Sequence, residues 1–548
     1  MPKPVILGLV ILCVILIIFF IIKRLASPKL LKIDLEGPFI PPPAGEGAKP
    51  LDEKTPCMLL QDNISETLKM AEQHIEKGEL DQAFALYEGL LPACPSNPDV
   101  LRGKGGVLFR MGKIDEGFMV NEEALRLDPG EYRTWFNRGM FLMLKGDPEN
   151  ADKSFRKATE LNPYDVPSYI QRAYCLGILE RMDEMLECCD RVLTLEPDNV
   201  QALVLRAKTM KMPGSEKEAL ETIDKALAID ESSFEAWRSR GLILISLGEL
   251  PRALESLDRA VKENPRYYMS WFDRAMVLER MGRFREALGS FDKALESEPR
   301  FFPALTHRAV CLGELSMPEE ALKAFDEVLS QKPDDLEALH QKALLLSGTG
   351  RPAEALPLIE KVIKVAGPSV PPLSAKATIL RKLGRLDEAL ATVEEILSLA
   401  PASAPMLTRK GLIAVELKLW DDAIASFDRA LELNPRDFSA WSNKGGALIE
   451  LGRLEEALAC EEKALKLDAK HAGVWANRGT ALFRLERFDE ALFSYDRALV
   501  LNPLDDMVLL WKGKTLEKMG KGAEAKQCFE EALRLNAHNV EASERLSS

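Results

Sequence analysis

Side chains that could carry out catalysis are few and scattered in this chain of 548 residues. Histidine is the usual general base near neutral pH, and it is also a common metal ligand. The five histidines lie far apart in the sequence, at His74, His307, His340, His471 and His538. No HExxH metal motif, GxSxG nucleophile turn, GxxxxGK[ST] phosphate loop or GxGxxG dinucleotide fingerprint occurs. The sequence therefore predicts no catalytic residues and no enzyme activity.

The cysteines could form redox or metal sites, but their spacing is irregular and contains no CxxC pair. Cys188 and Cys189 are adjacent, which could indicate a redox or metal site. The alternative, which we favour, is that both are small buried helix residues, because free cysteine packs as a small hydrophobe. We expect no metal, no cofactor, no disulfide framework and a reducing compartment.

The net charge argues against one class of partner. The formal charge is −14 and the isoelectric point is near 5.2. Proteins that bind nucleic acid usually present a basic surface to the phosphates. We therefore expect no nucleic-acid partner.

The N-terminus differs from the rest of the chain. Residues 4–22 read PVILGLVILCVILIIFFII and contain no charge. At about 1.5 Å per residue such a helix spans roughly 28 Å, close to a bilayer core. The alternative is a cleaved signal peptide, but its apolar region would be shorter and would end at small residues. We predict a single-pass transmembrane helix in the cell membrane.

The basic flanks of residues 4–22 predict the orientation. Lys3 precedes the segment, whereas Lys23, Arg24, Lys29 and Lys32 follow it. The positive-inside rule then places the rest of the chain in the cytoplasm. Residues 23–63 form a basic and then proline-rich linker. Proline removes backbone donors and fixes φ, so this segment predicts a semi-rigid spacer.

A 34-residue period covers residues 64–539. Stepping by 34 from Pro435 reaches a proline in ten of fourteen repeats. Within each repeat, position 8 is always Gly or Ala, position 20 is almost always Ala and position 24 is often aromatic. Small residues facing large ones predict two closely packed helices per repeat. The repeats begin at residues 64, 98, 132, 166, 200, 234, 268, 302, 336, 370, 404, 438, 472 and 506, and residues 540–548 remain as a C-terminal tail.

The repeated residues resemble those of the tetratricopeptide repeat (TPR) family. In repeat three they are Trp135, Gly139, Ala151, Phe155, Ala158 and Pro163. The resemblance implies an all-α fold, a right-handed superhelical solenoid of helix-turn-helix repeats. It departs from the family locally, since Trp occupies position 4 in only five repeats.

The resemblance also implies a site. Family members bind extended or helical peptides in a concave groove lined by positions 2, 5, 9, 12 and 13 of the first helices. Carried over, these positions give a candidate partner-binding groove at Phe136, Met140, Met143, Leu144, Arg238, Phe272, Met276 and Arg280. The alternative is that several of these residues pack between neighbouring repeats. No repeat has either the Lys at position 5 or the Asn at position 9 that clamp chaperone C-termini in some family members, so we do not expect that ligand.

Two further regularities lead to predictions. Position 7 is basic and position 25 acidic in thirteen repeats each. This is either a charged stripe for a partner or, as we favour, a ladder of ion pairs, for example Arg478 with Asp496. Pro357 lies inside a predicted helix, where proline costs about 3 kcal/mol. We therefore predict a kink or soft joint between Leu356 and Leu373.

Together these observations predict a membrane-anchored, non-catalytic scaffold that binds other proteins. Two alternatives stay open. One is a receptor or regulatory subunit for protein export or cell-envelope assembly. The other is a structural protein that associates with itself through its open ends.

Overall fold

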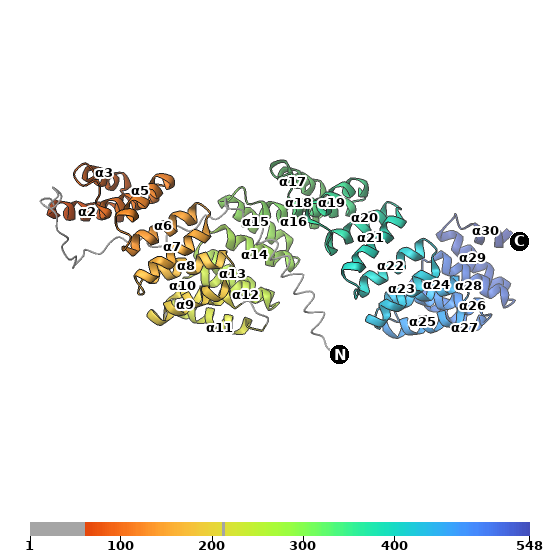
Figure 1. Ribbon diagram of the computed structural model, residues 1–548. Coiled ribbons are helices and arrows are strands. Elements are labelled where there is room, and N and C mark those ends of the chain that lie inside the picture. Colours follow the sequence, from red (N-terminus) through yellow and green to blue (C-terminus); the bar gives the residue numbers. More distant parts are fainter. Residues whose placement is uncertain (1–60, 211–213, 548) are drawn as a thin grey trace. The chain divides into compact units, whose positions relative to one another are not determined.

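The computed structural model describes residues 61–210 and 214–547, and every regular element in these ranges is a helix (Figure 1). The predicted membrane segment at 4–22 and the linker as far as residue 60 lie outside the described residues. Within the described ranges, no helix is both long enough and apolar enough to cross a membrane.

The helices follow one another as pairs in two compact modules, one ending at Glu298 and the other beginning at Pro299. The N-terminal module contains α2 (Gln61–Glu76), α3 (Leu80–Leu90), α4 (Pro98–Arg110), α5 (Ile114–Leu127), α6 (Tyr132–Leu144), α7 (Pro148–Leu161), α8 (Val166–Ile178), α9 (Met182–Leu195), α10 (Val200–Thr209), α11 (Glu216–Ile229), α12 (Phe234–Ser246), α13 (Leu250–Glu263), α14 (Tyr268–Arg280) and α15 (Phe284–Ser297).

The C-terminal module contains α16 (Phe302–Glu314), α17 (Pro318–Gln331), α18 (Leu336–Gly348), α19 (Pro352–Ala366), α20 (Val370–Lys382), α21 (Leu386–Leu399), α22 (Ala404–Glu416), α23 (Trp420–Leu433), α24 (Phe438–Glu450), α25 (Leu454–Leu467), α26 (Ala472–Arg484), α27 (Phe488–Leu501), α28 (Asp506–Lys518), α29 (Gly522–Leu535) and α30 (Val540–Ser547). In each module, successive helices pack side by side in chain order (Figure 1).

Local sequence explains where the helices begin and end. Proline occupies the first turn of α4, α7, α8 and α19, where its missing N–H costs little. Asp165 caps α8, because its carboxylate accepts a hydrogen bond from the Ser168 N–H at 3.0 Å. The link between the two helices of a pair needs a left-handed residue. Gly146 supplies it with φ of 75°, and where glycine is absent Lys418 takes φ of 60°.

The core of each pair is built from a small residue facing a large one, as the sequence predicts. A Cβ added at Gly139 would lie 2.5 Å from the Phe155 ring, and one at Gly479 would lie 2.6 Å from the Tyr495 ring. These distances are too short for any side chain larger than hydrogen unless the ring moves. Glycine at position 8 therefore lets the two helices of a pair approach closely.

At Pro357, where we predict a kink or soft joint, the structure shows no break in the helix. Helix α19 runs through Pro357 without interruption, and one core cluster contains Leu356 and Ile359 as well as Ala377 and Ile379 of α20. Pro357 is exposed, and so is Ala353, whose carbonyl is the acceptor that loses its partner. Water can bond that carbonyl, so the helix tolerates the proline here.

The predicted C-terminal tail begins with a helix that packs on the last pair. Asn539 accepts a hydrogen bond from the Ala542 N–H at 3.2 Å, and Ala542 is fully buried. Glu541 pairs with Lys514 at 2.6 Å. Helix α30 starts 34 residues after α28, so it occupies the place of a fifteenth first helix and covers the end of the core.

Candidate partner-binding surfaces

Within the described residues, no group of three or more His, Cys, Asp or Glu side chains could hold a metal ion. Cys188 and Cys189 are buried free thiols, and burial raises their pKa values to about 11 and about 12. Thiols with such pKa values are poor nucleophiles and poor ligands. The packing interpretation of this pair is therefore confirmed.

One cysteine differs from the expectation of reduced thiols. Cys94 is buried and disulfide-bonded. The other six described cysteines are all free and buried. Among the described residues, Cys94 is thus the one disulfide-bonded cysteine, and these residues contain no framework of several bridges.

Much of the charge ladder consists of ion pairs, as we favoured, but its register differs from the example we gave. Asp496 pairs with Lys512 of the next repeat at 2.7 Å, and Arg478 instead donates to the Ser494 hydroxyl at 2.6 Å. Each pair thus joins position 25 of one repeat to position 7 of the following repeat. The same register is found for Glu88–Lys104, Glu122–Arg138, Asp190–Arg206, Asp224–Arg240, Asp258–Arg274, Asp326–Lys342, Glu394–Lys410 and Asp428–Lys444.

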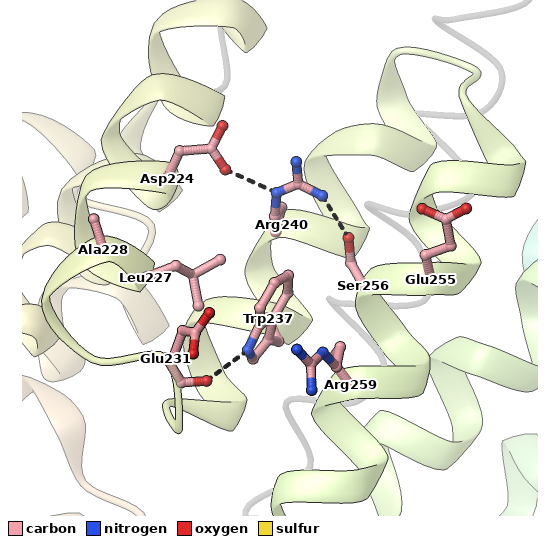
Figure 2. A pocket seen from close by; sticks show the side chains of 9 residues that line it. All are labelled: Asp224, Leu227, Ala228, Glu231, Trp237, Arg240, Glu255, Ser256 and Arg259. Carbon is pink, nitrogen blue, oxygen red and sulfur yellow. Dashed lines mark hydrogen bonds and ion pairs between the residues drawn. The ribbon is translucent and has the colours of Figure 1, made fainter.

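One such contact lines a crevice of about 490 Å³ formed by α11, α12 and α13 (Figure 2). Arg240 bonds Asp224 at 2.8 Å through Nε and the Ser256 hydroxyl at 2.9 Å through Nη1. The Trp237 indole N–H donates to the Glu231 carbonyl at 2.8 Å, and the Arg259 guanidinium lies 5.7 Å from the centroid of the Trp237 ring (Figure 2).

The Arg240 guanidinium and the Trp237 indole N–H already have partners within this crevice, and the same arrangement recurs elsewhere. Trp441 and Trp475 donate to the carbonyls six residues before them, and each lies between two cationic side chains. A recurring, internally satisfied contact is what stacking of the repeats requires. We therefore assign this crevice to the scaffold rather than to a ligand.

The predicted groove residues fall into two groups. Phe136 and Met140 are 4% and 8% exposed, and the Phe136 ring lies 5.8 Å from that of Phe155. These two residues therefore pack inside the array, as the alternative interpretation of the groove positions predicts. Met143 and Leu144, at the end of α6, are half-buried and contact the same cluster.

The remaining four predicted residues lie on α12 and α14. Arg238 donates to the Asp273 carboxylate at 2.6 Å, so an internal partner holds its charge. Phe272 and Met276 are half-buried, and Arg280 is exposed at the end of α14. The backbones of α12 and α14 lie in contact. We use the term first-helix face for the surface that the first helices of successive pairs form.

The sequence interpretation missed a second cleft, of about 390 Å³, on the first-helix face between α20 and α22. Arg381, Lys382, Arg409 and Glu416 are among the residues that line it. Three cations against one carboxylate is an unusual composition for this acidic chain. The sequence held a signal, because Arg381 and Lys382 occupy groove positions 12 and 13 of repeat ten.

Models of the tetratricopeptide repeat match much of the chain. They align with residues 132–165, 166–199, 217–268, 272–335, 340–404, 374–432, 408–472, 472–504 and 508–539, together more than half of the sequence. No curated protein matches the sequence significantly.

Solved structures resemble the chain at low sequence identity. A crystal structure of the APC/C hetero-tetramer Cut9-Hcn1 is 16% identical with a TM-score of 0.47, and the match covers 90% of this chain and 97% of that one. MamA from residue 41 to its end, from Desulfovibrio magneticus RS-1, is 20% identical with a TM-score of 0.29 over 30% of this chain and 94% of that one.

The family matches and the repeated helix pairs lead to the same assignment. TPR arrays generally serve as non-catalytic scaffolds for contacts between proteins. The chain belongs to the tetratricopeptide repeat family.

Proposed function

We propose that this protein is a membrane-anchored scaffold that holds partner proteins on its first-helix face. Residues 4–22 would anchor it in the cell membrane, with the array in the cytoplasm. The observation that carries the proposal is the contrast between two kinds of surface. In the crevice of Figure 2, the Arg240 guanidinium and the Trp237 indole N–H bond groups of this chain, whereas Met276 and Arg280 reach solvent on the first-helix face.

The chemistry of these residues suits a protein partner. Methionine adapts its shape to apolar side chains, and arginine is enriched in protein interfaces. Met143 and Leu144 supply further half-buried apolar surface at the C-terminal end of α6. The partner would be a peptide segment or a helix that lies across several repeats.

Site-specific photo-crosslinking tests the proposal in cells that express the full chain. A photoreactive amino acid replaces Arg280 on α14 in one variant and Arg285 on α15 in the other. Both arginines are exposed and belong to the same helix pair, so the variants differ in the face that carries the probe. We expect protein adducts from position 280 and few from position 285. Equal yields at both positions, or no adducts at position 280, would contradict the proposal.

A further inference from the structure

The cleft between α20 and α22 is more open than its neighbours on the first-helix face. The backbones of α18 and α20 lie in contact, as do those of α22 and α24, but α20 and α22 approach each other less closely. The space between them is the cleft of about 390 Å³. Such a volume admits one or two side chains of a partner, not a folded domain.

Charge inside the cleft is unbalanced. Arg381 binds Glu416 through Nε at 2.6 Å, and Glu416 is the sole carboxylate among the residues that line the cleft. Lys382 donates to the Ser347 carbonyl at 2.6 Å, and that acceptor is neutral. Arg409 and Lys382 therefore leave an excess of two positive charges.

The Arg409 guanidinium has hydrogen-bond donors that are not used within the described residues. Its Nη1 group bonds the Ser374 carbonyl and the Thr378 hydroxyl, each at 3.2 Å. Within the described residues, neither Nε nor Nη2 has a hydrogen-bond partner, and no carboxylate pairs with this guanidinium. Those two groups form the edge that binds a carboxylate through two parallel hydrogen bonds. Burial and the neighbouring Arg381 lower the pKa of Arg409, as expected for a cation without a counter-charge.

Two cations elsewhere on the first-helix face, Arg484 and Arg238, have carboxylate partners. Arg484 lies 3.5 Å from Glu450, and Arg238 lies 2.6 Å from Asp273. Arg409 in the cleft differs from these two arginines, because no carboxylate among the described residues pairs with it. In a protein of net charge −14, such a cleft attracts anionic groups locally, although the surrounding surface repels extended polyanions.

We propose that the cleft between α20 and α22 binds an acidic side chain of a partner protein, with Arg409 as the bidentate ligand of the carboxylate and Lys382 as a second cation. The inference rests on the scaffold function proposed above and names the chemistry of the segment that the scaffold holds. The carboxylate that we propose belongs to an internal Asp or Glu side chain of the partner, which enters the cleft between the two helices.

Fluorescence anisotropy with the full chain in detergent or nanodiscs tests this proposal. The probes are two capped, fluorescent peptides of about ten residues, one with several glutamates and one with glutamines in their place. Capping removes the terminal charges. At low salt we expect the glutamate peptide to bind at least about tenfold more tightly, and added salt to weaken its binding.

Three substitutions locate the site. Arg409→Gln should remove most of the preference for glutamate, and Lys382→Gln should reduce it by less. Lys382 is exposed, so its substitution leaves the core intact. Arg484→Gln is the matched control, because it removes the same charge from a cation that already has a carboxylate partner. The control should keep the preference.

Several results would overturn the proposal. One is equal binding of the two peptides, and another is a preference that survives Arg409→Gln. Arg409-dependent binding to vesicles of anionic lipid, without a preference for the glutamate peptide, would assign the cleft to a membrane surface instead. If the glutamate peptide shows no preferential binding but adducts at position 280 are still found, the scaffold function is supported and only this inference is wrong. If both fail, the scaffold function falls as well.

Discussion

At the scale of single residues, Glu461 breaks the pattern of the core. It occupies position 24, where Tyr495 and Phe427 fill the same place in other repeats, and it is fully buried. One carboxyl oxygen accepts a hydrogen bond from Asn477 at 3.1 Å, and the other has no partner. Burial raises the pKa of Glu461 to about 9, so this acid stays protonated at neutral pH.

This raised pKa predicts a pH-dependent stability of the helices around Glu461. The unfolded carboxyl titrates near 4.5, so the folded state binds more protons between that value and about 9. Ionisation of Glu461 therefore does not reduce the free energy of unfolding below pH 4.5, and it lowers this free energy progressively as pH rises from 4.5 to about 9. The Glu461→Gln variant cannot ionise. The free energy of local opening should therefore be higher in this variant than in the unmodified chain. We expect that difference to grow by about 1–3 kcal/mol between about pH 5.5 and about pH 7.5.

Native-state hydrogen exchange in α24, α25 and α26 measures this effect, because long repeat arrays do not unfold in one step. Comparing both proteins at each pH removes the intrinsic pH dependence of exchange. Glu462→Gln, at the adjacent exposed position, is the control and should change little. If Glu461→Gln and the unmodified chain show the same pH dependence, Glu461 does not titrate as inferred.

At the scale of elements, the turn inside each pair needs left-handed backbone. Glycine supplies it in most pairs, but Glu180, Ser316, Lys418 and Glu486 adopt φ values between 58° and 62° there. A side chain in this region costs about 1 kcal/mol relative to glycine. The array thus carries local strain at four turns within the described residues.

Removing that strain should stabilise the pair. We expect Lys418→Gly to slow exchange at the ends of α22 and α23 by an amount that corresponds to about 0.5–1 kcal/mol. Gly452→Ala, at the same position of the next repeat, where φ is 75°, is the reverse experiment and should be destabilising. Slower exchange in both variants, or in neither, would show that backbone conformation does not limit these turns.

The ion pairs between repeats lead to a second prediction at this scale. A double-mutant cycle on Asp496 and Lys512 should give a coupling energy of about 0.2–1 kcal/mol, because both side chains are partly exposed. The same cycle on Asp496 and Arg478 should give none, since these residues do not pair. Local exchange in α27 and α28 gives the energies. Coupling only in the second cycle would place the pairs within repeats.

Comparison of sequence with structure shows why some features could be predicted and others not. The period of 34 residues predicts the helix pairs. So does the combination of a small residue at position 8 with a large one at position 24, because both features depend on packing within a pair. The register of the charge ladder depends on how one pair stacks on the next, which the period alone leaves open. Burial of Phe136 and the openness between α20 and α22 likewise depend on distances between helices.

At the scale of the whole molecule, the proposed membrane anchor leads to a prediction of which side of the membrane would carry the array. The positive-inside rule favours the cytoplasm, because Lys23, Arg24, Lys29 and Lys32 follow the predicted span and only Lys3 precedes it. A cysteine in an exposed position of the array reports its side directly. Met119 on α5 is 70% exposed, so Met119→Cys would be reactive in the folded protein.

The native cysteines interfere little with this measurement. Six of them are free but buried, and burial raises the pKa of Cys175 to about 12 and that of Cys460 to about 11. Such thiols react slowly with maleimides. The unmodified chain, labelled in parallel, gives the background from the remaining cysteines.

We expect a membrane-impermeant maleimide to label Met119→Cys in lysed cells but not in intact cells or spheroplasts. That result would direct the search for the acidic partner to cytosolic proteins and to the inner face of the membrane. Labelling before lysis would contradict the predicted orientation. The same first-helix face and the same cleft at Arg409 would then meet proteins outside the cytoplasm, where the disulfide at Cys94 would also be stable.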